Sequence, residues 1–206
     1  MAYVLGFFVA DGYITVNRRG GQFWCIQITD KELLENIKIV LNSEHKISMR
    51  LPKKRTRNIT HRIQIGSKEM CEDLRRLGIV ENKTKNLKLP EMPKKYLPHF
   101  VRGYFDGDGN IWMGEIHRER KTRHQALLLA FTSCSHEFLS NLRKHLESFG
   151  VEGGSLFRSK KKEFSRLQYS TKNALKLGDL MYNGDIGDLF LQRKKRVFNE
   201  FESLRL

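Results

Sequence analysis

Acidic residues are scarce in this sequence of 206 residues, in which 23 Asp and Glu stand against 38 Lys and Arg. The formal net charge is +15, and the isoelectric point lies near 9.9. Charge of one sign repels itself in a folded protein, so it usually persists because the partner is a polyanion. The imbalance favours a nucleic acid as that partner; the alternatives are solubility and binding to an acidic membrane surface.

Cysteines and long hydrophobic runs are also few. Cys25, Cys71 and Cys134 are far apart and form no Cys-x-x-Cys pair, which argues against a disulfide framework and fits a reducing compartment. The seven histidines show no His-Glu-x-x-His spacing. Residues 1–10 are apolar, but they lack a basic start and are too short to span a bilayer. We expect a soluble intracellular protein, in the cytoplasm or an organelle matrix, with no membrane partner.

The sequence does contain an internal repeat. Three segments recur in the same order and at nearly the same spacing: residues 4–14 as 101–111, residues 30–37 as 135–142, and residues 62–68 as 166–172. Matches of this kind indicate a duplicated fold. The spacing grows after the second Asp-Gly pair, which places an insertion around residues 115–125.

Each half has the same predicted order of elements. Residues 4–10 are apolar and end at Gly12, as a helix with a glycine stop does. Residues 13–29 are rich in β-forming residues broken by Arg19-Gly20-Gly21, which predicts a hairpin. A helix beginning after Asp30, a second hairpin and a helix beginning after Ser67 complete the half.

We therefore predict an α/β (α+β) protein with two pseudo-symmetric α-β-β-α-β-β-α halves. Residues 1–81 form the first half, residues 82–98 form a proline-containing linker, and residues 99–206 form the second half. The second half closes with a basic amphipathic helix after residue 191.

Both Asp-Gly pairs follow a stripe of small residues on a predicted helix. The stripes are Gly6 with Ala10 and Gly103 with Gly107. Residues four apart share one helix face, so each stripe allows another backbone to approach closely. If the two helices pack through these stripes, their C-terminal ends meet, and Asp11 and Asp108 lie side by side.

That position is electrostatically unfavourable for two carboxylates. Each faces the negative end of a helix dipole, and the two repel each other. A divalent cation resolves both problems, which predicts a Mg²⁺ site built from Asp11, Gly12, Asp108 and Gly109. Beside a phosphodiester such a metal can activate water and stabilise the leaving oxygen. The alternative is that each Asp-Gly is an ordinary helix stop or turn.

A third acid, Asp106, is not expected to bind metal. Its counterpart in the first half is Val9, so it lacks a symmetric partner. Residues 106–117 also fail as a calcium-binding EF-hand loop, because Ile111 replaces the required glycine and His117 replaces the required acid.

Residues 5–14 and 100–109 resemble the two signature helices of LAGLIDADG homing endonucleases, and the resemblance extends to Leu89-Pro90 and to residues 191–195. It implies a monomer whose antiparallel sheets form a DNA-binding saddle, with the two signature helices at the central interface. Such a protein hydrolyses both strands of a long DNA site with Mg²⁺, and its staggered cut leaves 3′ overhangs.

The resemblance also assigns residues to roles. The acid that ends each signature motif corresponds to Asp11 and to Asp108. A basic residue that follows the fourth strand of each half corresponds to Lys68 and Lys172, and a cation there could stabilise the pentavalent phosphate. The alternative for these lysines is a solvated position in the first turn of a helix.

Basic residues gather in the predicted hairpins and are candidates for binding double-stranded DNA. They are Arg18, Arg19, Lys53, Lys54, Arg55, Arg57, Arg62, Arg118, Arg120, Lys121, Arg123, Arg158, Lys160, Lys161, Lys162 and Arg166. A β-ribbon fits the major groove, where some of these side chains can read base edges and others contact phosphates. Two other functions stay open on the same scaffold: a maturase that binds intron RNA, and a DNA-binding regulator without nuclease activity.

Overall fold

The computed structural model describes residues 1–52, 58–81, 86–117, 124–159 and 162–204. These residues form two four-stranded antiparallel sheets and seven α-helices, arranged as two similar halves. The chain divides into two compact units. The first contains Met1–Lys83, Pro90–Gly107 and Ile186–Phe190, and the second contains Thr84–Leu89, Asp108–Asp185 and Leu191–Leu206.

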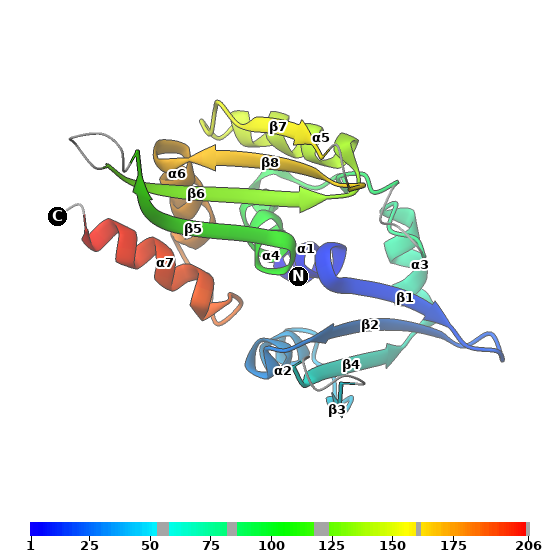
Figure 1. Ribbon diagram of the computed structural model, residues 1–206. Helices are drawn as coiled ribbons and strands as arrows, with labels where there is room; N and C mark the ends of the chain where they lie inside the picture. The colour runs from blue at the N-terminus through cyan, green and yellow to red at the C-terminus, as the bar shows by residue number, and fades with distance from the viewer. Residues whose placement is uncertain (53–57, 82–85, 118–123, 160–161, 205–206) are drawn as a thin grey trace. The chain divides into compact units, whose positions relative to one another are not determined.

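The first unit follows the element order predicted for the first half (Figure 1). Its elements are α1 (Ala2–Asp11), β1 (Gly12–Val16), β2 (Gln22–Ile28), α2 (Lys31–Val40), β3 (Ser48–Arg50), β4 (Thr60–Gly66) and α3 (Lys68–Arg76). A 3₁₀ turn (Lys94–Tyr96) leads into α4 (Leu97–Asp108), which belongs to this unit up to Gly107. The strands lie in the order β1-β2-β4-β3, all antiparallel.

The second unit repeats this arrangement. Its elements are β5 (Gly109–Ile116), β6 (His124–Ser133), α5 (His136–Glu147), β7 (Ser155–Arg158), β8 (Ser165–Ser170), α6 (Thr171–Tyr182) and α7 (Gln192–Ser203). The strand order β5-β6-β8-β7 matches that of the first sheet. Strands β5 and β6 have 8 and 10 residues where β1 and β2 have 5 and 7, so the extra residues of the second half lengthen this hairpin.

The first hairpin turns where the glycines predict it. Gly20 has a φ of 81°, a left-handed conformation that glycine adopts without strain. The side-chain oxygen of Asn17 accepts hydrogen bonds from the backbone N–H groups of Arg19 and Gly21, at 2.9 and 2.8 Å. The side chain thus satisfies the backbone of the turn and leaves both arginines at its tip, Arg18 and Arg19, exposed.

Side chains on the two faces of the first sheet differ in kind. The face that packs against the helices carries buried residues in two rows: Gly12, Ile26 and Ile63, and Ile14, Trp24 and Ile65. The Trp24 ring stacks on Phe8 of α1 at 5.1 Å between centroids. Because side chains alternate along a strand, the neighbouring rows lie on the opposite face, away from the stacked Phe8 ring; this face is called the helix-free face below.

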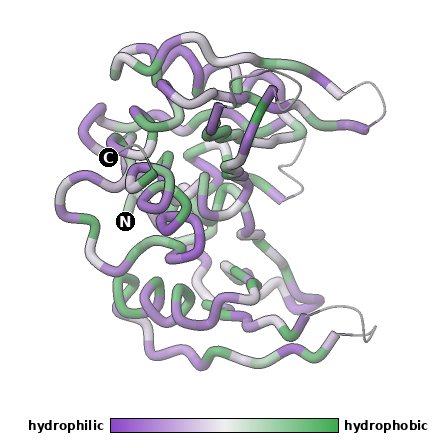
Figure 2. Tube along the Cα trace, turned by 60° about the vertical axis from the view of Figure 1, so that its left-hand side comes forward, coloured by the Kyte–Doolittle hydropathy of each residue, from purple (hydrophilic) through white to green (hydrophobic). Residues whose placement is uncertain are grey.

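Apolar and hydrophilic residues alternate at short intervals along the chain (Figure 2). Within the described residues, each helix is too short or too polar to cross a membrane. The longest helices in that part of the chain have 12 residues.

Candidate functional site

Helices α1 and α4 pack through glycines within the first unit. A Cβ atom on Gly6 would overlap the carbonyl oxygen of Phe100. In the same way, a Cβ atom on Gly103 would overlap the carbonyl oxygen of Tyr3. The backbones of the two helices are therefore in direct contact, which only glycine permits at these positions.

The contact continues to the C-terminal ends of the two helices. A Cβ atom on Gly107 would overlap the Ala10 side chain and would stand 3.3 Å from Asp11 Oδ2. The Asp11 carboxylate thus lies beside Gly107, the residue that precedes Asp108 in helix α4. Both Asp11 and Asp108 are solvent-exposed.

Asp106 occupies a different environment, inside the helix pair. It is 1% exposed, and Oδ2 accepts a hydrogen bond of 2.8 Å from the Tyr3 hydroxyl. Arg102, one turn earlier, is also buried; its Nε donates to the Leu189 carbonyl at 3.0 Å, and its guanidinium lies 5.3 Å from the Tyr3 ring centroid. This cluster gives Asp106 a structural role in joining α1 to α4.

Strand register places an arginine near Asp11. Gly12 pairs with Ile26, and Ile26 pairs with Ile63. The next row toward the end of α1 therefore holds Gln27 of β2 and Arg62 of β4, both on the face away from the helices. Arg62 Nε is buried, and the described part of the chain offers it no hydrogen-bond partner.

The second half repeats this row. Gly109 pairs with Phe131, and the row that follows toward Asp108 holds Thr132 paired with Arg166. Arg166 Nε is likewise buried without a hydrogen-bond partner among the residues described. Each half therefore carries an arginine two strands from its acid, about 10 Å at the usual strand spacing.

Lys194 of helix α7 is the residue that the sequence reasoning missed. It is 5% exposed, and Nζ donates a hydrogen bond of 2.7 Å to the carbonyl oxygen of Gly109. Because Gly109 follows Asp108, a buried ammonium group stands at the start of β5 beside the second acid. The Gly109 carbonyl, a predicted metal ligand, is thus already directed at a cation of the protein.

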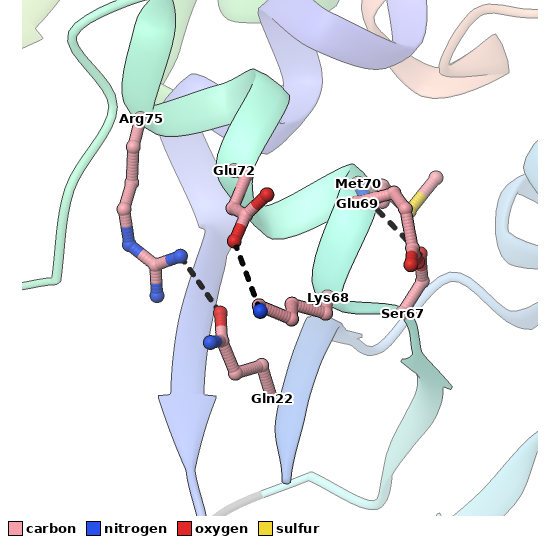
Figure 3. Close-up of polar contacts among 7 residues, drawn as sticks. All are labelled: Gln22, Ser67, Lys68, Glu69, Met70, Glu72 and Arg75. Carbon is pink, nitrogen blue, oxygen red and sulfur yellow. Dashed lines mark hydrogen bonds and ion pairs between the residues drawn. The ribbon is translucent and has the colours of Figure 1, made fainter. Parts of the chain in front are cut away.

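Lys68 does not lie near Asp11. It begins helix α3, its side chain is 69% exposed, and it forms an ion pair with Glu72 at 3.7 Å (Figure 3). The last residue of β4, Gly66, lies two positions before Lys68 and pairs with Phe23, which is level with Thr15 at the turn end of the hairpin. Asp11 stands at the other end of β1, so the two residues belong to opposite ends of the strands.

The same register applies to Lys172, the exposed second residue of α6. It follows Ser170, which pairs with Leu128, and Leu128 pairs with Trp112, three residues beyond Gly109 in β5. The sequence pattern led to these lysines because both follow the fourth strand, but that strand runs away from the acid rather than toward it.

A family model for the LAGLIDADG-like domain matches residues 1–78 and 95–182. The chain belongs to the LAGLIDADG family. The two matched segments correspond to the two halves of the repeat, each opening with one of the glycine-packed helices.

Solved LAGLIDADG structures share this fold over nearly the whole chain. A mesophilic variant of the homing endonuclease I-DmoI is 14% identical, with 94% of this chain and 95% of that chain covered and a TM-score of 0.63. The homing endonuclease I-LtrWI, bound to its target DNA, is 15% identical, with 98% and 88% covered and a TM-score of 0.65. The meganuclease I-AabMI, bound to uncleaved DNA, is 18% identical, with 98% and 88% covered and a TM-score of 0.63.

A curated relative matches over a short segment. The probable translation initiation factor IF-2 of Thermococcus kodakarensis is 34% identical over 73 residues, which is 34% of this chain. The chain covers only 5% of that protein's length.

The helix-free faces of the LAGLIDADG sheets carry no acidic side chain among the described strand residues. In the first sheet the face holds Tyr13, Thr15, Phe23, Cys25, Gln27, Ser48, Arg50, Thr60, Arg62 and Gln64. In the second it holds Asn110, Trp112, Ile116, His124, Leu128, Thr132, Ser155, Phe157, Arg166, Gln168 and Ser170. A surface of this composition, with arginines and no carboxylates, suits a polyanion.

Two side chains near this face are removed from contact with a ligand. Cys25 is buried, and burial raises the pKa of its thiol, although Arg62 opposes this; the thiol therefore stays protonated and is not a nucleophile. Gln22 lies on the helix side, where its Oε1 accepts a hydrogen bond of 2.7 Å from Arg75 (Figure 3).

The predicted DNA-binding residues fall into four groups. Arg18, Arg19 and Lys162 are exposed, whereas Arg62 and Arg166 are half-buried on the helix-free faces. Arg158 follows Phe157 in β7 and so points to the opposite, helix-covered side of the sheet. Burial lowers the pKa of His136, and the charge of Arg158 lowers it further. Ten others lie outside the described residues: Lys53, Lys54, Arg55, Arg57, Arg118, Arg120, Lys121, Arg123, Lys160 and Lys161.

Proposed function

We propose that this LAGLIDADG protein is a site-specific endonuclease that cleaves both strands of a DNA duplex with a divalent metal ion. The observation that carries the proposal is the glycine contact between α1 and α4, which sets the Asp11 carboxylate beside the residue preceding Asp108. Two carboxylates at adjoining helix C-termini repel each other and face the negative ends of both helix dipoles. A bound divalent cation would offset both effects. Solved structures of the same fold are described as nucleases bound to DNA, one of them with manganese.

The residues fit a magnesium ion. Carboxylate oxygens are the ligands that Mg²⁺ prefers. Gly107 packs against Ala10 and so brings the backbone just before Asp108 close to the Asp11 carboxylate. Asp11 and Asp108 are the proposed ligands. When bound, the metal would supply Lewis-acid activation of water and of the leaving oxygen.

The chain's own cations complete the proposed site. Lys194 holds the Gly109 carbonyl and so fixes the backbone that carries Asp108, while its charge offsets that of the acid. Arg62 and Arg166 stand about two strand spacings from the acids, within reach of a phosphate group that sits over the helix end. A guanidinium there can stabilise the charge that develops on a phosphate during hydrolysis.

DNA would be held on the helix-free sheet faces. Each half supplies one β-sheet with polar side chains at the acid end of its strands, and β-ribbons of this kind fit the major groove. Because both halves belong to one chain, the protein would act as a monomer on a duplex whose two half-sites differ in sequence. A maturase role with intron RNA is the second function open to this scaffold, and cleavage of DNA distinguishes the two.

The test begins with the target. Incubating the protein and Mg²⁺ with a randomised duplex library, and sequencing the cut molecules, identifies the site. Asp11→Asn and Asp108→Asn should then abolish double-strand cleavage, because each removes a charged metal ligand. Binding of the duplex should persist or tighten, since a negative charge beside the phosphates is lost.

The control for these variants is Asp106→Asn in the same helix. Its side chain can still accept the Tyr3 hydrogen bond, so the folded fraction should cleave normally although stability falls by about 1–3 kcal/mol. Cleavage at the wild-type rate by Asp11→Asn would refute the assignment. Binding without any cleavage by the wild-type chain would show a DNA-binding regulator instead.

A further inference from the structure

Trp112 is an exposed indole on the helix-free face of the second sheet. Its exposed fraction is 42%, whereas the other tryptophan, Trp24, is 2% exposed in the core. The ring is folded along β5 onto Gly114, because a Cβ atom at Gly114 would stand 2.6 Å from Trp112 Cζ2. Glycine at this position therefore lets the indole lie flat on the strand, in a fixed orientation and with one side open to solvent.

The indole is the centre of an apolar area. Leu128 of β6 is directly opposite Trp112, and Ala126 is opposite Gly114. Ile116 follows on the same face of β5 and is half-buried. The apolar surface thus occupies the outer part of the hairpin, while Arg166, Gln168 and Thr132 occupy the part next to Asp108.

The first half presents a less apolar area at the same place. In its register, Thr15 stands where Trp112 does, and Phe23 stands where Leu128 does. The first hairpin then turns at Asn17, whereas β5 continues to Ile116. The two sheets therefore present different chemistry at the same distance from their acids. The first has a hydroxyl beside Phe23 and then a polar turn, and the second has an exposed indole with Leu128 and Ile116.

We infer that the Trp112 surface, made of Trp112, Gly114, Ile116 and Leu128, binds thymine methyl groups in the major groove of one half-site. This inference rests on the proposed function. The surface is continuous with the polar rows of a sheet face on which no described strand residue is acidic, so a polyanion can lie across it. Within the major groove, the thymine C5 methyl is the apolar group that a base pair displays.

A substrate class follows from this assignment. The half-site read by the second sheet is rich in A·T pairs at its outer positions, with thymine on the strand that faces β5 and β6. The half-site read by the first sheet is recognised by hydrogen bonds instead, from side chains such as Gln27 and Gln64. The target is therefore asymmetric in the kind of contact as well as in sequence.

The test replaces thymine by deoxyuridine, which lacks only the methyl group. In the selected target, deoxyuridine in the outer half-site of the second sheet should weaken binding, by about fourfold for each contacted methyl. The same replacement in the opposite half-site is the matched control and should leave Kd unchanged. Trp112→Thr, which installs the residue that the first half carries, should lose the preference for thymine in library selection.

Testing the deoxyuridine duplex against the Trp112→Thr variant shows whether Trp112 itself contacts the thymine methyl group. In Trp112→Thr the deoxyuridine and thymine duplexes should bind equally, because the methyl partner is gone. Tyr96→Thr, at an equally exposed aromatic in the 3₁₀ turn, should keep the wild-type response. Wild-type fluorescence gives an independent readout, since DNA should shield Trp112 from acrylamide and leave the buried Trp24 unchanged.

Three outcomes would overturn the inference. Equal binding of thymine and deoxyuridine duplexes by the wild-type chain overturns it while leaving the nuclease proposal intact, provided that the target is still cut. An equal loss in wild type and Trp112→Thr shows that the methyl groups contact other residues. Failure to bind any duplex overturns both the inference and the proposed function.

Discussion

At the scale of single residues, Lys194 is one of four consecutive cations at the start of α7, and only it is buried. A charged amine is costly to bury, so its hydrogen bond to the Gly109 carbonyl and its nearness to Asp108 explain its position. We predict that Lys194→Met, which keeps the length of the side chain, lowers the cleavage rate by about 100-fold or more with little change in DNA affinity.

Lys172→Met is the matched control for this prediction. Lys172 is exposed and lies beyond the far end of β8 from the acid, so its removal should leave the rate within about twofold of wild type. Single-turnover cleavage of a bound duplex separates rate from affinity, and thermal melting corrects for any loss of fold. If Lys172→Met reduced cleavage and Lys194→Met did not, the sequence-based assignment would be right and the structural one wrong.

The two acids and the lysine differ in how far the sequence could predict them. Asp11 and Asp108 could be found because each ends a repeated motif, and a repeat is visible in the letters alone. Lys194 could not be chosen over Arg193 or Lys195, because which cation of a basic run is buried depends on how the helix packs against β5. The strand register could not be predicted either. The sequence predicted the strands, but only their pairing in the structure shows that Gln27 and Arg62 lie opposite each other.

At the scale of elements, the contact between α1 and α4 depends on glycine because backbone meets backbone. A methyl group on Gly103 would collide with the Tyr3 carbonyl oxygen, and neither helix backbone can shift without disturbing the packed core around it. We predict that Gly103→Ala destabilises the protein by about 3 kcal/mol, as overpacking at a rigid contact does.

Gly66→Ala provides the comparison, since a Cβ atom there would only touch the Phe23 ring at an ordinary 3.4 Å. It should change the free energy of unfolding by less than about 1 kcal/mol. Urea denaturation followed by circular dichroism measures both variants. Equal stability of Gly103→Ala and wild type would mean that the helices can separate, and the argument for adjoining acids would lose its support.

Element boundaries show where a correct prediction had a different cause. Helix α1 ends at Asp11 and Gly12 is its C-cap, as the sequence predicted, but Gly12 has φ −83° and ψ 160°, an extended conformation that any residue adopts. Glycine is required there because a Cβ atom would overlap the Phe8 ring, which stacks on Trp24. The need arises from packing between a helix and the sheet, which local turn preferences do not contain.

At the scale of the whole molecule, the net charge of +15 and the acid-free described rows of the two sheet faces make DNA binding largely electrostatic. Each phosphate contact releases counterions, so affinity falls steeply with salt. We predict that the affinity for the selected duplex falls by about 10³-fold or more between 50 and 200 mM salt, measured by fluorescence anisotropy.

Single substitutions divide this salt dependence between contacts of different kinds. Arg166→Gln should lower the slope of log affinity against log salt by about one, because one phosphate contact is lost. Trp112→Thr should weaken binding at every salt concentration by a similar factor and leave the slope unchanged, since contact with a methyl group releases no counterion. A steeper or shallower slope in Trp112→Thr would show that the indole positions a cation, and an unchanged slope in Arg166→Gln would remove that arginine from the DNA-contacting set.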